Sequence, residues 1–438
     1  MELKPGYKQT DVGVIPEDWE TRPCSTLSDL ITVGIVVRPT QYYTRQGVPA
    51  LRSANIREDG IDDADMVFIS AKSNALLSKS QVRAGDVLTV RTGYPGTSAV
   101  VPAALAGSNC IDILIMRPSK AISSTYLAEW INSPFGKYQV LRNQGGLAQQ
   151  HFNVGDLRNL VVALPMKAEQ EAIAEALIDA DTLIDQLELL ITKKRQIKQG
   201  AMQELLTGKR RIAAFGPAKP QYKNTDAGQI PEDWGVHALR DEIESLDAGV
   251  SVNSTEDEVG VDVDNIYILK TSSVANGIFN PNECKRVARN DLKRVKLPAR
   301  ANCIVISRMN TPDLVGECGY INEDYPHLFL PDRLWMIRFR SRTEICPKWL
   351  NHLLSSAVYK RKLKEVATGT SGSMKNISQD ALLSLRVPWP EPKEQFAIAN
   401  IISDMDAELK AIEDELAKAR GLKQGMMQEL LTGRIRLK

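Results

Sequence analysis

Two arginine residues stand directly after predicted strands, each in a turn that contains glycine or proline. Arg91 follows the run DVLTV and begins RTGYPG, and Arg308 follows CIVIS and begins RMNTPD. Arginine presents five N–H donors in a planar fork that suits guanine and phosphate acceptors. A strand end projects such a side chain from a rigid support. The two positions therefore predict contacts to a nucleic acid, with a solvated charged face as the alternative.

Further basic and polar side chains accompany these arginines. The segment 285–308 carries eight basic residues against a single acid, Asp291. Two polar loops, 143–152 and 369–378, hold glycine for close backbone approach and Gln, Asn, Ser or Lys as hydrogen-bonding groups. A generic flexible loop is the alternative for each. The candidate contact residues are Arg52, Arg91, Thr92, Tyr94, Gln149, Gln150, Lys270, Arg294, Arg308, Asn310, Ser371 and Lys375.

The familiar catalytic motifs are absent from the sequence. It has no GxxxxGK[ST], GxGxxG, HExxH or GxSxG, and no Asn/Asp-Pro-Pro-aromatic tetrapeptide of the amino-methyltransferases. The four histidines are isolated, and the ExK at Glu283 lacks a suitable preceding aspartate. We therefore expect no catalytic residue, no metal site and no cofactor in this chain.

The composition is that of a soluble globular protein with about three structural units. The chain has 438 residues, of which 43% are hydrophobic and 25% charged, and a net charge of +1. No apolar run is long enough to span a membrane, and no secretory signal is visible. Six scattered cysteines without a CxxC pair indicate neither a disulfide framework nor a zinc site. A cytoplasmic location fits these features.

The elements that must position the candidate residues occur twice. YKQTDVGVIPEDW (Tyr7 to Trp19) and YKNTDAGQIPEDW (Tyr222 to Trp234) match at ten of thirteen positions. KQGAMQELLTG (Lys198 to Gly208) and KQGMMQELLTG (Lys423 to Gly433) match at ten of eleven. The segments between them are far less alike. The sequence thus predicts one fold used twice, with its framework kept and its binding surface changed.

Each half contains a mixed domain followed by a long helix. Short apolar runs between Gly, Pro, Asn and Asp predict strands and turns, and TYLAEWINS and PKWLNHLLSS predict short helices. After Pro165 the apolar positions Ile173, Leu177, Ala180, Ile184, Leu187 and Ile191 alternate in steps of four and three, and an equivalent series runs from Ile398 to Leu416.

This heptad spacing predicts that the two helices pack on each other as a coiled coil. Surface helices on a larger core are the alternative. Pro392 suits a first helical turn, and Gly208 and Gly433 suit C-terminal stops. Gly200 and Gly425, inside the helices, indicate either a close approach or a kink.

The ordered set of these motifs resembles the specificity subunits of type I restriction–modification systems. The elements that carry the resemblance are IPEDW, the block from EQ (Glu169-Gln170 and Glu394-Gln395) to QELLTG, the RTGYPG and SRMNTPD segments, and their duplication. The resemblance covers essentially the whole chain.

The resemblance implies an α+β fold in which two tandem mixed α/β target-recognition domains alternate with two long helices. The helices are expected to pack as an antiparallel coiled coil with pseudo-two-fold symmetry. The expected segments are domain 1 (1–164), helix 1 (165–210), domain 2 (211–389, with a linker at 211–221) and helix 2 (390–438).

The implied function is recognition of an asymmetric bipartite site in double-stranded DNA. The implied partners are two modification (methyltransferase) subunits, which would bring S-adenosylmethionine, and restriction (motor–nuclease) subunits where a host has them. Two other classes stay open. One is a stand-alone restriction or modification enzyme, and the other is a coiled-coil scaffold that works without DNA.

Overall fold

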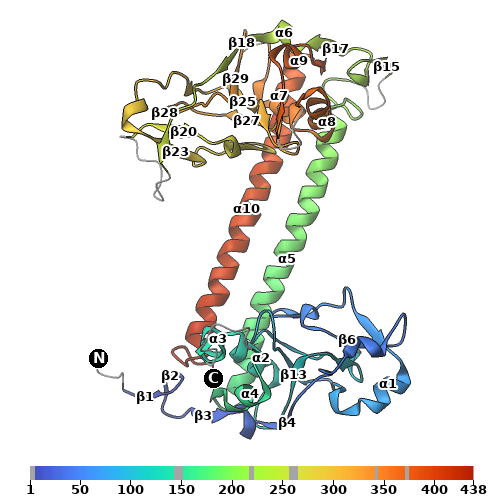
Figure 1. Ribbon diagram of the computed structural model, residues 1–438, viewed down its shortest axis with the longest axis vertical. Coiled ribbons are helices and arrows are strands. Elements are labelled where there is room, and N and C mark those ends of the chain that lie inside the picture. The colour runs from blue at the N-terminus through green and yellow to red at the C-terminus, as the bar shows by residue number, and fades with distance from the viewer. Residues whose placement is uncertain are drawn as a thin grey trace. The chain divides into compact units, whose positions relative to one another are not determined.

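The structure is a computed structural model, and it describes residues 5–142, 151–216, 221–255, 265–340, 344–369 and 374–437 (Figure 1). Helices and strands are both abundant, which confirms the α+β class expected from the sequence. Within the described residues no helix is both long enough and apolar enough to cross a membrane.

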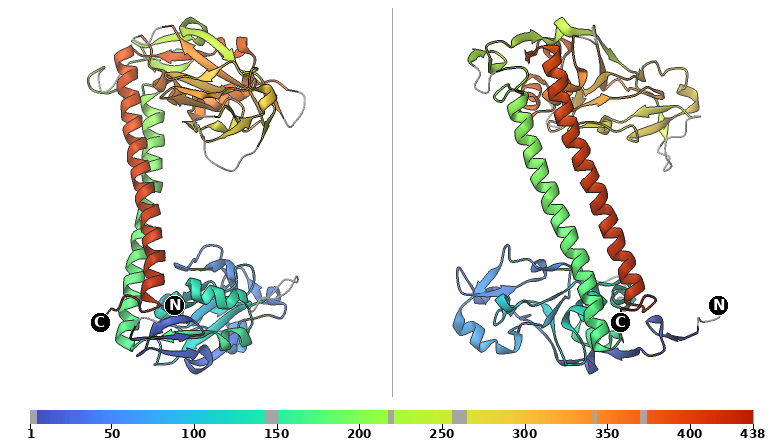
Figure 2. Two further views of the ribbon diagram at one scale, coloured as in Figure 1. Left: turned by 90° about the vertical axis from the view of Figure 1, so that its left-hand side faces the viewer. Right: turned by 180° about the vertical axis from the view of Figure 1, so that it is seen from behind.

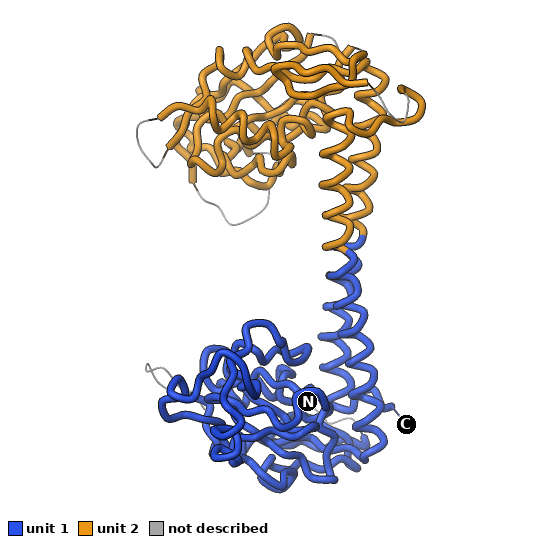
Figure 3. Tube along the Cα trace, turned by 90° about the vertical axis from the view of Figure 1, so that its right-hand side faces the viewer, with its two compact units in different colours: residues 1–190, 412–438 blue, residues 191–411 orange. Residues whose placement is uncertain are grey.

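The chain forms two compact units that do not follow its sequence order (Figure 3). Unit 1 consists of residues 1–190 and 412–438, and unit 2 consists of residues 191–411. The long helices α5 (Lys167–Leu205) and α10 (Pro392–Leu430) each contribute to both units. Each unit is therefore completed by a helix segment from the other half of the sequence.

Unit 1 is built on an antiparallel sheet with the strand order β11-β10-β13-β4. All residues of its central strand β10 (Val87–Val90) are buried, as its continuous run of Val, Leu and Thr predicts. Val87 packs with α2 (Ser124–Asn132) on one face, and Leu88 packs with Leu51 on the other. A second sheet has the order β12-β6-β9-β5. The remaining elements of unit 1 are β1 (Tyr7–Thr10), β2 (Gly13–Pro16), β3 (Glu20–Pro23), β4 (Ser28–Val33), β5 (Tyr43–Thr44), β6 (Val48–Leu51), β7 (Ile56–Arg57), β8 (Gly60–Ile61), β9 (Val67–Ile69), α1 (Ala71–Leu76), β11 (Ser98–Val100), β12 (Asn109–Cys110), β13 (Ile113–Pro118), α3 (Pro134–Arg142), α4 (Val154–Asn159) and β14 (Val161–Leu164).

Unit 2 repeats this plan with additional strands. Its main sheet has the order β18-β29-β25-β27-β22-β21, and a second sheet has the order β19-β23-β20-β28-β24. The central strand β25 (Cys303–Ser307) is buried throughout, like β10. Its elements are β15 (Tyr222–Thr225), β16 (Gly228–Pro231), β17 (Gly235–Ala238), α6 (Leu239–Glu242), β18 (Ile243–Ala248), β19 (Ser254–Thr255), β20 (Tyr267–Leu269), β21 (Val274–Ala275), β22 (Gly277–Phe279), β23 (Cys284–Val287), β24 (Pro298–Ala299), β26 (Met309–Asn310), β27 (Cys318–Ile321), β28 (Tyr325–Phe329), β29 (Leu334–Phe339), α7 (Pro347–Leu354), α8 (Ala357–Val366), β30 (Lys375–Asn376), α9 (Gln379–Leu383) and β31 (Arg386–Trp389).

The two main sheets share four strands in the same order. β4, β13, β10 and β11 of unit 1 correspond to β18, β29, β25 and β27 of unit 2. The pairing register also corresponds, because Val90 faces Ile113 in unit 1 and Ser307 faces Leu334 in unit 2. One fold is thus used twice, although the sequences of these sheets have diverged.

The long helices run antiparallel within each unit (Figure 2). In unit 1, Asp181 and Glu188 of α5 pair with Lys423 and Arg420 of α10, so that residue numbers rise along one helix and fall along the other. In unit 2, Lys194 pairs with Glu408 and Lys198 with Asp406, in the same sense. Such partly exposed pairs contribute about 0–1 kcal/mol each. Apolar positions of the predicted seam are buried, and burial of such side chains stabilises a fold more than these pairs do. Ile173 and Leu177 share a core with Met427 of α10, and Ile398 and Ile402 share a core with Leu205 of α5. The other buried seam positions include Leu187 and Leu409.

The repeated IPEDW motif is an anchor on the end of a long helix, as its tryptophan suggested. In unit 1 the buried Trp19 donates its indole N–H to Glu169 over 3.2 Å. Arg436, which follows α10, binds Glu169 at 2.6 Å and Asp18 at 2.8 Å, and its guanidinium lies over the Trp19 ring. The pKa of Arg436 is raised by its hydrogen bonds to these two carboxylates.

Unit 2 contains the same cluster. Trp234 donates to Glu394 over 3.0 Å, and Arg211, which follows α5, binds Glu394 at 2.6 Å and Asp233 at 2.8 Å. Burial disfavours the charge of Arg211, but the Asp233 and Glu394 carboxylates outweigh that penalty and raise its pKa. Only 2% of the Arg211 side chain and 3% of the Glu394 side chain are exposed, so neither ion could be left alone without a large cost.

Glycine ends both long helices where the anchors pack. Gly208 and Gly433 have φ angles of 69° and 67°, as their C-terminal role predicts. A Cβ on Gly208 would lie 2.5 Å from the Pro231 ring, and one on Gly433 would lie 2.5 Å from the Pro16 ring. These two positions therefore require glycine for both backbone and packing reasons.

The glycines inside the helices have a different setting. α5 and α10 continue through Gly200 and Gly425 without interruption. A Cβ at either position would meet no atom of the described chain within 4 Å. The close approach considered from the sequence is therefore wrong within the described residues.

Candidate nucleic-acid interface

Arg91 and Arg308 occupy equivalent places at the ends of the central strands. Arg91 follows β10, and its carbonyl accepts a hydrogen bond from the N–H of Phe152 over 3.1 Å. Arg308 follows β25, and its carbonyl accepts from Ile377 over 2.8 Å. Each arginine is thus fixed between a buried strand and the segment that follows a polar loop. The structure brings the strand-end turn and that segment together in both units.

The side chain of Arg91 is held by a carboxylate. Its Nη1 lies 2.8 Å from Oδ1 of Asp112, the residue before β13. About a quarter of the Arg91 side chain is exposed, against 41% of the Asp112 side chain. The Arg91 Nε is buried and has no hydrogen-bond partner among the described residues, so the accessible donors are those on its two terminal nitrogens.

The side chain of Arg308 is held by an aromatic ring instead. Its guanidinium lies over the Trp335 ring, 5.4 Å from the centroid. Its backbone N–H donates to the carbonyl of Arg333 over 3.1 Å. Among the ion pairs of the described residues, none joins a carboxylate to Arg308, so its contact with the Trp335 ring takes the place that the Asp112 carboxylate has beside Arg91.

The turn after Arg91 contains two further candidates. Thr92 lies with its Oγ1 2.8 Å from Nδ1 of His151, so this turn contacts the segment after the polar loop. Tyr94 has 85% of its surface exposed. Gln149 and Gln150 lie outside the described residues. Thr92 and Tyr94 are thus near Arg91 in the fold as well as in the sequence.

Arg52 and Lys270 stand at equivalent positions before short 3-10 turns, at Ser53–Asn55 and Thr271–Ser273. An Nη2 of Arg52 donates to the carbonyl of Asp65 over 2.5 Å. Lys270 lies 3.9 Å from the carboxylate of Glu283. Both side chains are partly exposed, but both already have a partner within their own unit.

The remaining candidates of unit 2 divide into two groups. Asn310 and Lys375 face each other where β26 pairs with β30, directly after Arg308. Arg294 instead binds Asp291 at 3.0 Å, and Asp291 also accepts from the backbone of Asn253. These bonds lower the pKa of Asp291, and they give Arg294 a structural role in holding the loop. Ser371 lies outside the described residues.

Sequence reasoning missed Asp112 and Trp335, which contact the two arginines. Both lie in segments remote in sequence from the turns that they support, and no local motif marks them. The polar loop 143–152 predicted from the sequence does include His151 and Phe152, which contact the turn after β10. The signal that could have found Asp112 is the alignment of β13 with β29, which places Asp112 and Arg333 at one equivalent position.

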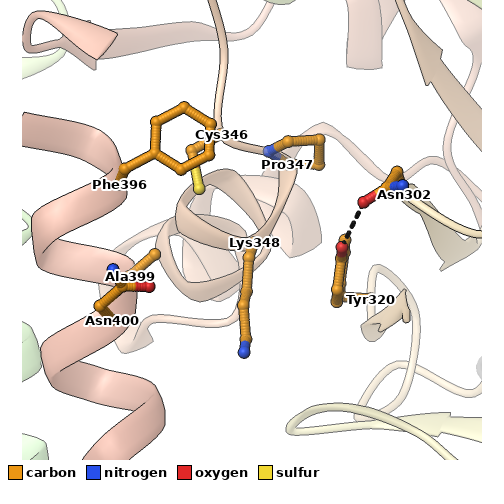
Figure 4. A pocket seen from close by; sticks show the side chains of 8 residues that line it. All are labelled: Asn302, Tyr320, Cys346, Pro347, Lys348, Phe396, Ala399 and Asn400. Atoms are coloured by element: carbon orange, nitrogen blue, oxygen red, sulfur yellow. Dashed lines mark hydrogen bonds between the residues drawn. The ribbon is translucent and has the colours of Figure 1, made fainter. Parts of the chain in front are cut away.

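A pocket in unit 2 lies apart from these candidates (Figure 4). Its volume is about 220 Å³, and it opens between the starts of α7 and α10. Its wall includes Lys348, Phe396 and a hydrogen bond of 2.7 Å from Tyr320 to Asn302. Among the described residues of the whole chain, no group of three His, Cys, Asp or Glu side chains is placed to hold a metal ion.

Comparison with known proteins relates the chain to one class over nearly its full length. It is 25% identical to the EcoKI specificity subunit of Escherichia coli, over 97% of this chain and 90% of that protein. It is 22% identical to the StySPI specificity subunit of Salmonella potsdam, over 96% and 89%. Both relatives are named as type I restriction enzyme subunits. The chain resembles type I restriction specificity subunits throughout.

Solved structures agree in fold. The chain superposes on the type I restriction–modification S subunit from M. genitalium with a TM-score of 0.55 and 13% identity, covering 98% of both chains. No protein-family model matches the sequence. The likeness to this solved structure is one of fold.

Proposed function

We propose that this protein is the DNA-specificity subunit of a type I restriction–modification complex. The observation that carries the proposal is the end-to-end similarity to specificity subunits, shared by a chain that itself contains one fold twice. Each unit would act as a target-recognition domain for one half-site. Because the strand-end residues of the two units differ, the half-sites would differ, and the target would be bipartite and asymmetric.

The long helices would form an antiparallel coiled coil and provide docking surfaces for two modification subunits. Those subunits would carry S-adenosylmethionine and the adenine-methylating groups, and restriction subunits would join where the host has them. This chain would then supply sequence recognition without a catalytic residue of its own. Its basic strand ends are suited to that task, because arginine offers paired donors to base edges and phosphates.

Co-expression with the host's modification subunit tests the proposal. The expected result is methylated adenine in one two-part motif, detected by whole-genome modification sequencing. Cells that lack this chain but contain the modification subunit should show no such motif. Methyl transfer by the purified chain alone would contradict the non-catalytic role.

A scaffold that works without DNA is the competing function. The observation in its favour is that α5 and α10 pair with each other through contacts within the chain. A scaffold would show no salt-dependent binding to duplex DNA. A specificity subunit should lose affinity steeply as salt rises, because each phosphate contact releases counterions. Titration of the complex with labelled duplex at two salt concentrations separates the two functions.

A further inference from the structure

The position that faces the strand-end arginine carries opposite charges in the two units. In unit 1, Ile113 pairs with Val90, and the residue before Ile113 is Asp112. In unit 2, Leu334 pairs with Ser307, and the residue before Leu334 is Arg333. Asp112 and Arg333 therefore occupy one equivalent position, each beside the arginine that follows the central strand.

Asp112 is held in an unfavourable backbone conformation. Its φ angle is 51°, in the left-handed region that favours glycine and that Asn and Asp adopt more readily than other residues. Its N–H donates to the carbonyl of Ile35 over 3.1 Å, which fixes the backbone there. The carboxylate points at Arg91, yet 41% of the side chain is exposed. A partly exposed ion pair stabilises a fold little. Stability alone therefore does not explain why position 112 holds aspartate rather than glycine, the residue that this backbone conformation favours most.

The equivalent position in unit 2 holds a second cation in place of the carboxylate. Arg308 lies over Trp335, and Arg333 is exposed beside it. The neighbouring acid, Asp332, accepts a hydrogen bond from Ser251 over 2.5 Å. Unit 2 thus presents two cations where unit 1 presents one cation and one carboxylate.

These two sets suit different base edges. Guanine shows two acceptors, O6 and N7, in the major groove, and paired guanidinium donors match them. A carboxylate beside an arginine adds an acceptor, which suits a donor such as the cytosine or adenine amino group. The same carboxylate repels phosphate and disfavours an edge that offers acceptors alone. A change of charge at this position would therefore change which base edge matches the strand end.

We propose that Asp112 and Arg333 are specificity-determining residues of the two half-sites. This inference rests on the function proposed above. Unit 1 reads an amino group next to an acceptor through the Arg91–Asp112 pair. Unit 2 reads an acceptor-only edge through Arg308 and Arg333.

Exchange of the charges tests the inference in the complex with modification subunits. The variants are Asp112→Asn, Asp112→Gly and Arg333→Asp, with Asp11→Asn in an exposed hairpin turn as the charge-matched control. Asparagine tolerates a left-handed backbone and glycine relieves its strain, so loss of folding is not the expected cause of any effect. The readouts are the methylated motif across a genome and the affinity for a duplex without the motif at several salt concentrations.

Both Asp112 variants should relax one base pair of the first half-site about ten-fold and leave the second half-site unchanged. The plot of log affinity against log salt for non-target duplex should steepen by up to about one, because Arg91 becomes free to contact phosphate. Arg333→Asp should alter the second half-site only. Unchanged first half-sites in both Asp112 variants, with the parent motif intact, would overturn the inference alone. A parent complex that methylates no motif would instead overturn the proposed function.

Discussion

Single arginines at the strand ends should each affect one half-site. Arg91→Ala removes the donors that β10 projects, and Arg308→Ala removes those that β25 projects. Each substitution should cost about 1–3 kcal/mol of discrimination in its own half-site, because hydrogen-bond donors to a base edge are lost. The measurement is methylation of duplexes that carry one altered base pair in either half. Arg22→Ala, on the exposed strand β3, is the control. Equal weakening of both half-sites by either change would contradict the assignment.

At the scale of residues, the sequence predicts side chains that lie in repeated motifs better than it predicts the residues that contact them. Trp19 and Trp234 are recognisable as anchors because they lie in a repeated motif, and the structure confirms that role. Their arginine partners are not recognisable, since Arg436 is more than 400 residues from Trp19 along the chain. The candidate DNA contacts stay predictions. Arg294, which binds Asp291, shows that a basic run alone does not separate structural residues from contact residues.

At the scale of elements, the equivalent helices α2 and α7 each bury a titratable residue, and the pKa values of these two residues are shifted in opposite directions. Gln170 accepts from the N–H of Ser123, and Gln395 accepts from Cys346, so α2 and α7 are aligned. Six residues further along, α2 carries Glu129 and α7 carries His352, both buried. Burial, only partly offset by Lys423, raises the pKa of Glu129 from 4.5 to about 7. Burial also lowers the pKa of His352 from 6.5 to about 4, although Asp406 opposes the shift.

The signs of these shifts predict two different stability profiles. In the folded chain Glu129 keeps its proton to a higher pH than in the unfolded chain. Its contribution to the free energy of unfolding therefore falls as pH rises from 4.5 to about 7. In the folded chain His352 stays neutral to a lower pH than in the unfolded chain. Its contribution to the free energy of unfolding therefore falls as pH drops from 6.5 to about 4. Each effect is at most about 3–4 kcal/mol. Glu129→Gln should therefore raise the Tm at pH 7.5 more than at pH 5, and His352→Asn should raise it at pH 5 only. The same pH dependence in both variants would contradict the assignment.

Glycines in the long helices should differ in their tolerance of alanine. Gly200→Ala and Gly425→Ala should each raise the free energy of unfolding by about 1 kcal/mol, because alanine favours the helix and its Cβ meets open space. Gly208→Ala should lower it, because φ is 69° and the new Cβ would collide with Pro231. Urea unfolding midpoints measure all three. A loss of stability in Gly200→Ala would contradict the expectation that a Cβ at this position meets open space.

The elements themselves follow from local sequence. The heptad spacing predicts both long helices, and Pro392 and the C-terminal glycines place their ends close to where the structure has them. The continuous apolar runs predict β10, β25 and β29. Strand order does not follow from such patterns, because it depends on pairing between segments far apart in the sequence. The second sheets, with their parallel pairs β12–β6 and β20–β28, were therefore not predicted.

At the scale of the whole molecule, half of the chain should assemble with a second copy of itself. Unit 1 requires Arg436 and Lys423 from the second half, and the first half contains their equivalents, Arg211 and Lys198. A fragment of residues 1–216 should therefore form a dimer, because each copy completes the other and the apolar seam is buried. With the modification subunit it should methylate a palindrome of the first half-site. Light scattering and modification sequencing provide the test.

A monomeric fragment would contradict this expectation, as would methylation confined to the original asymmetric motif. Arg211→Ala in the fragment is a useful comparison, since it removes the residue that must serve the second copy. Repetition in the sequence predicts two equivalent folds. It does not predict which helix end completes which unit, because both ends carry the same motif.

The cluster around Trp19 has a consequence for the order in which the protein matures. Residues 191–411 contain everything that unit 2 needs, including Arg211 and Glu394. Unit 1 begins at the N-terminal side of the chain but lacks its arginine until the ribosome has added residue 436. Domains usually finish in the order of their synthesis. Here unit 2 can fold completely before unit 1, because the cluster around Trp19 still lacks Arg436 at that stage. A message truncated shortly before residue 436 would therefore yield a finished second unit attached to an unfinished first one.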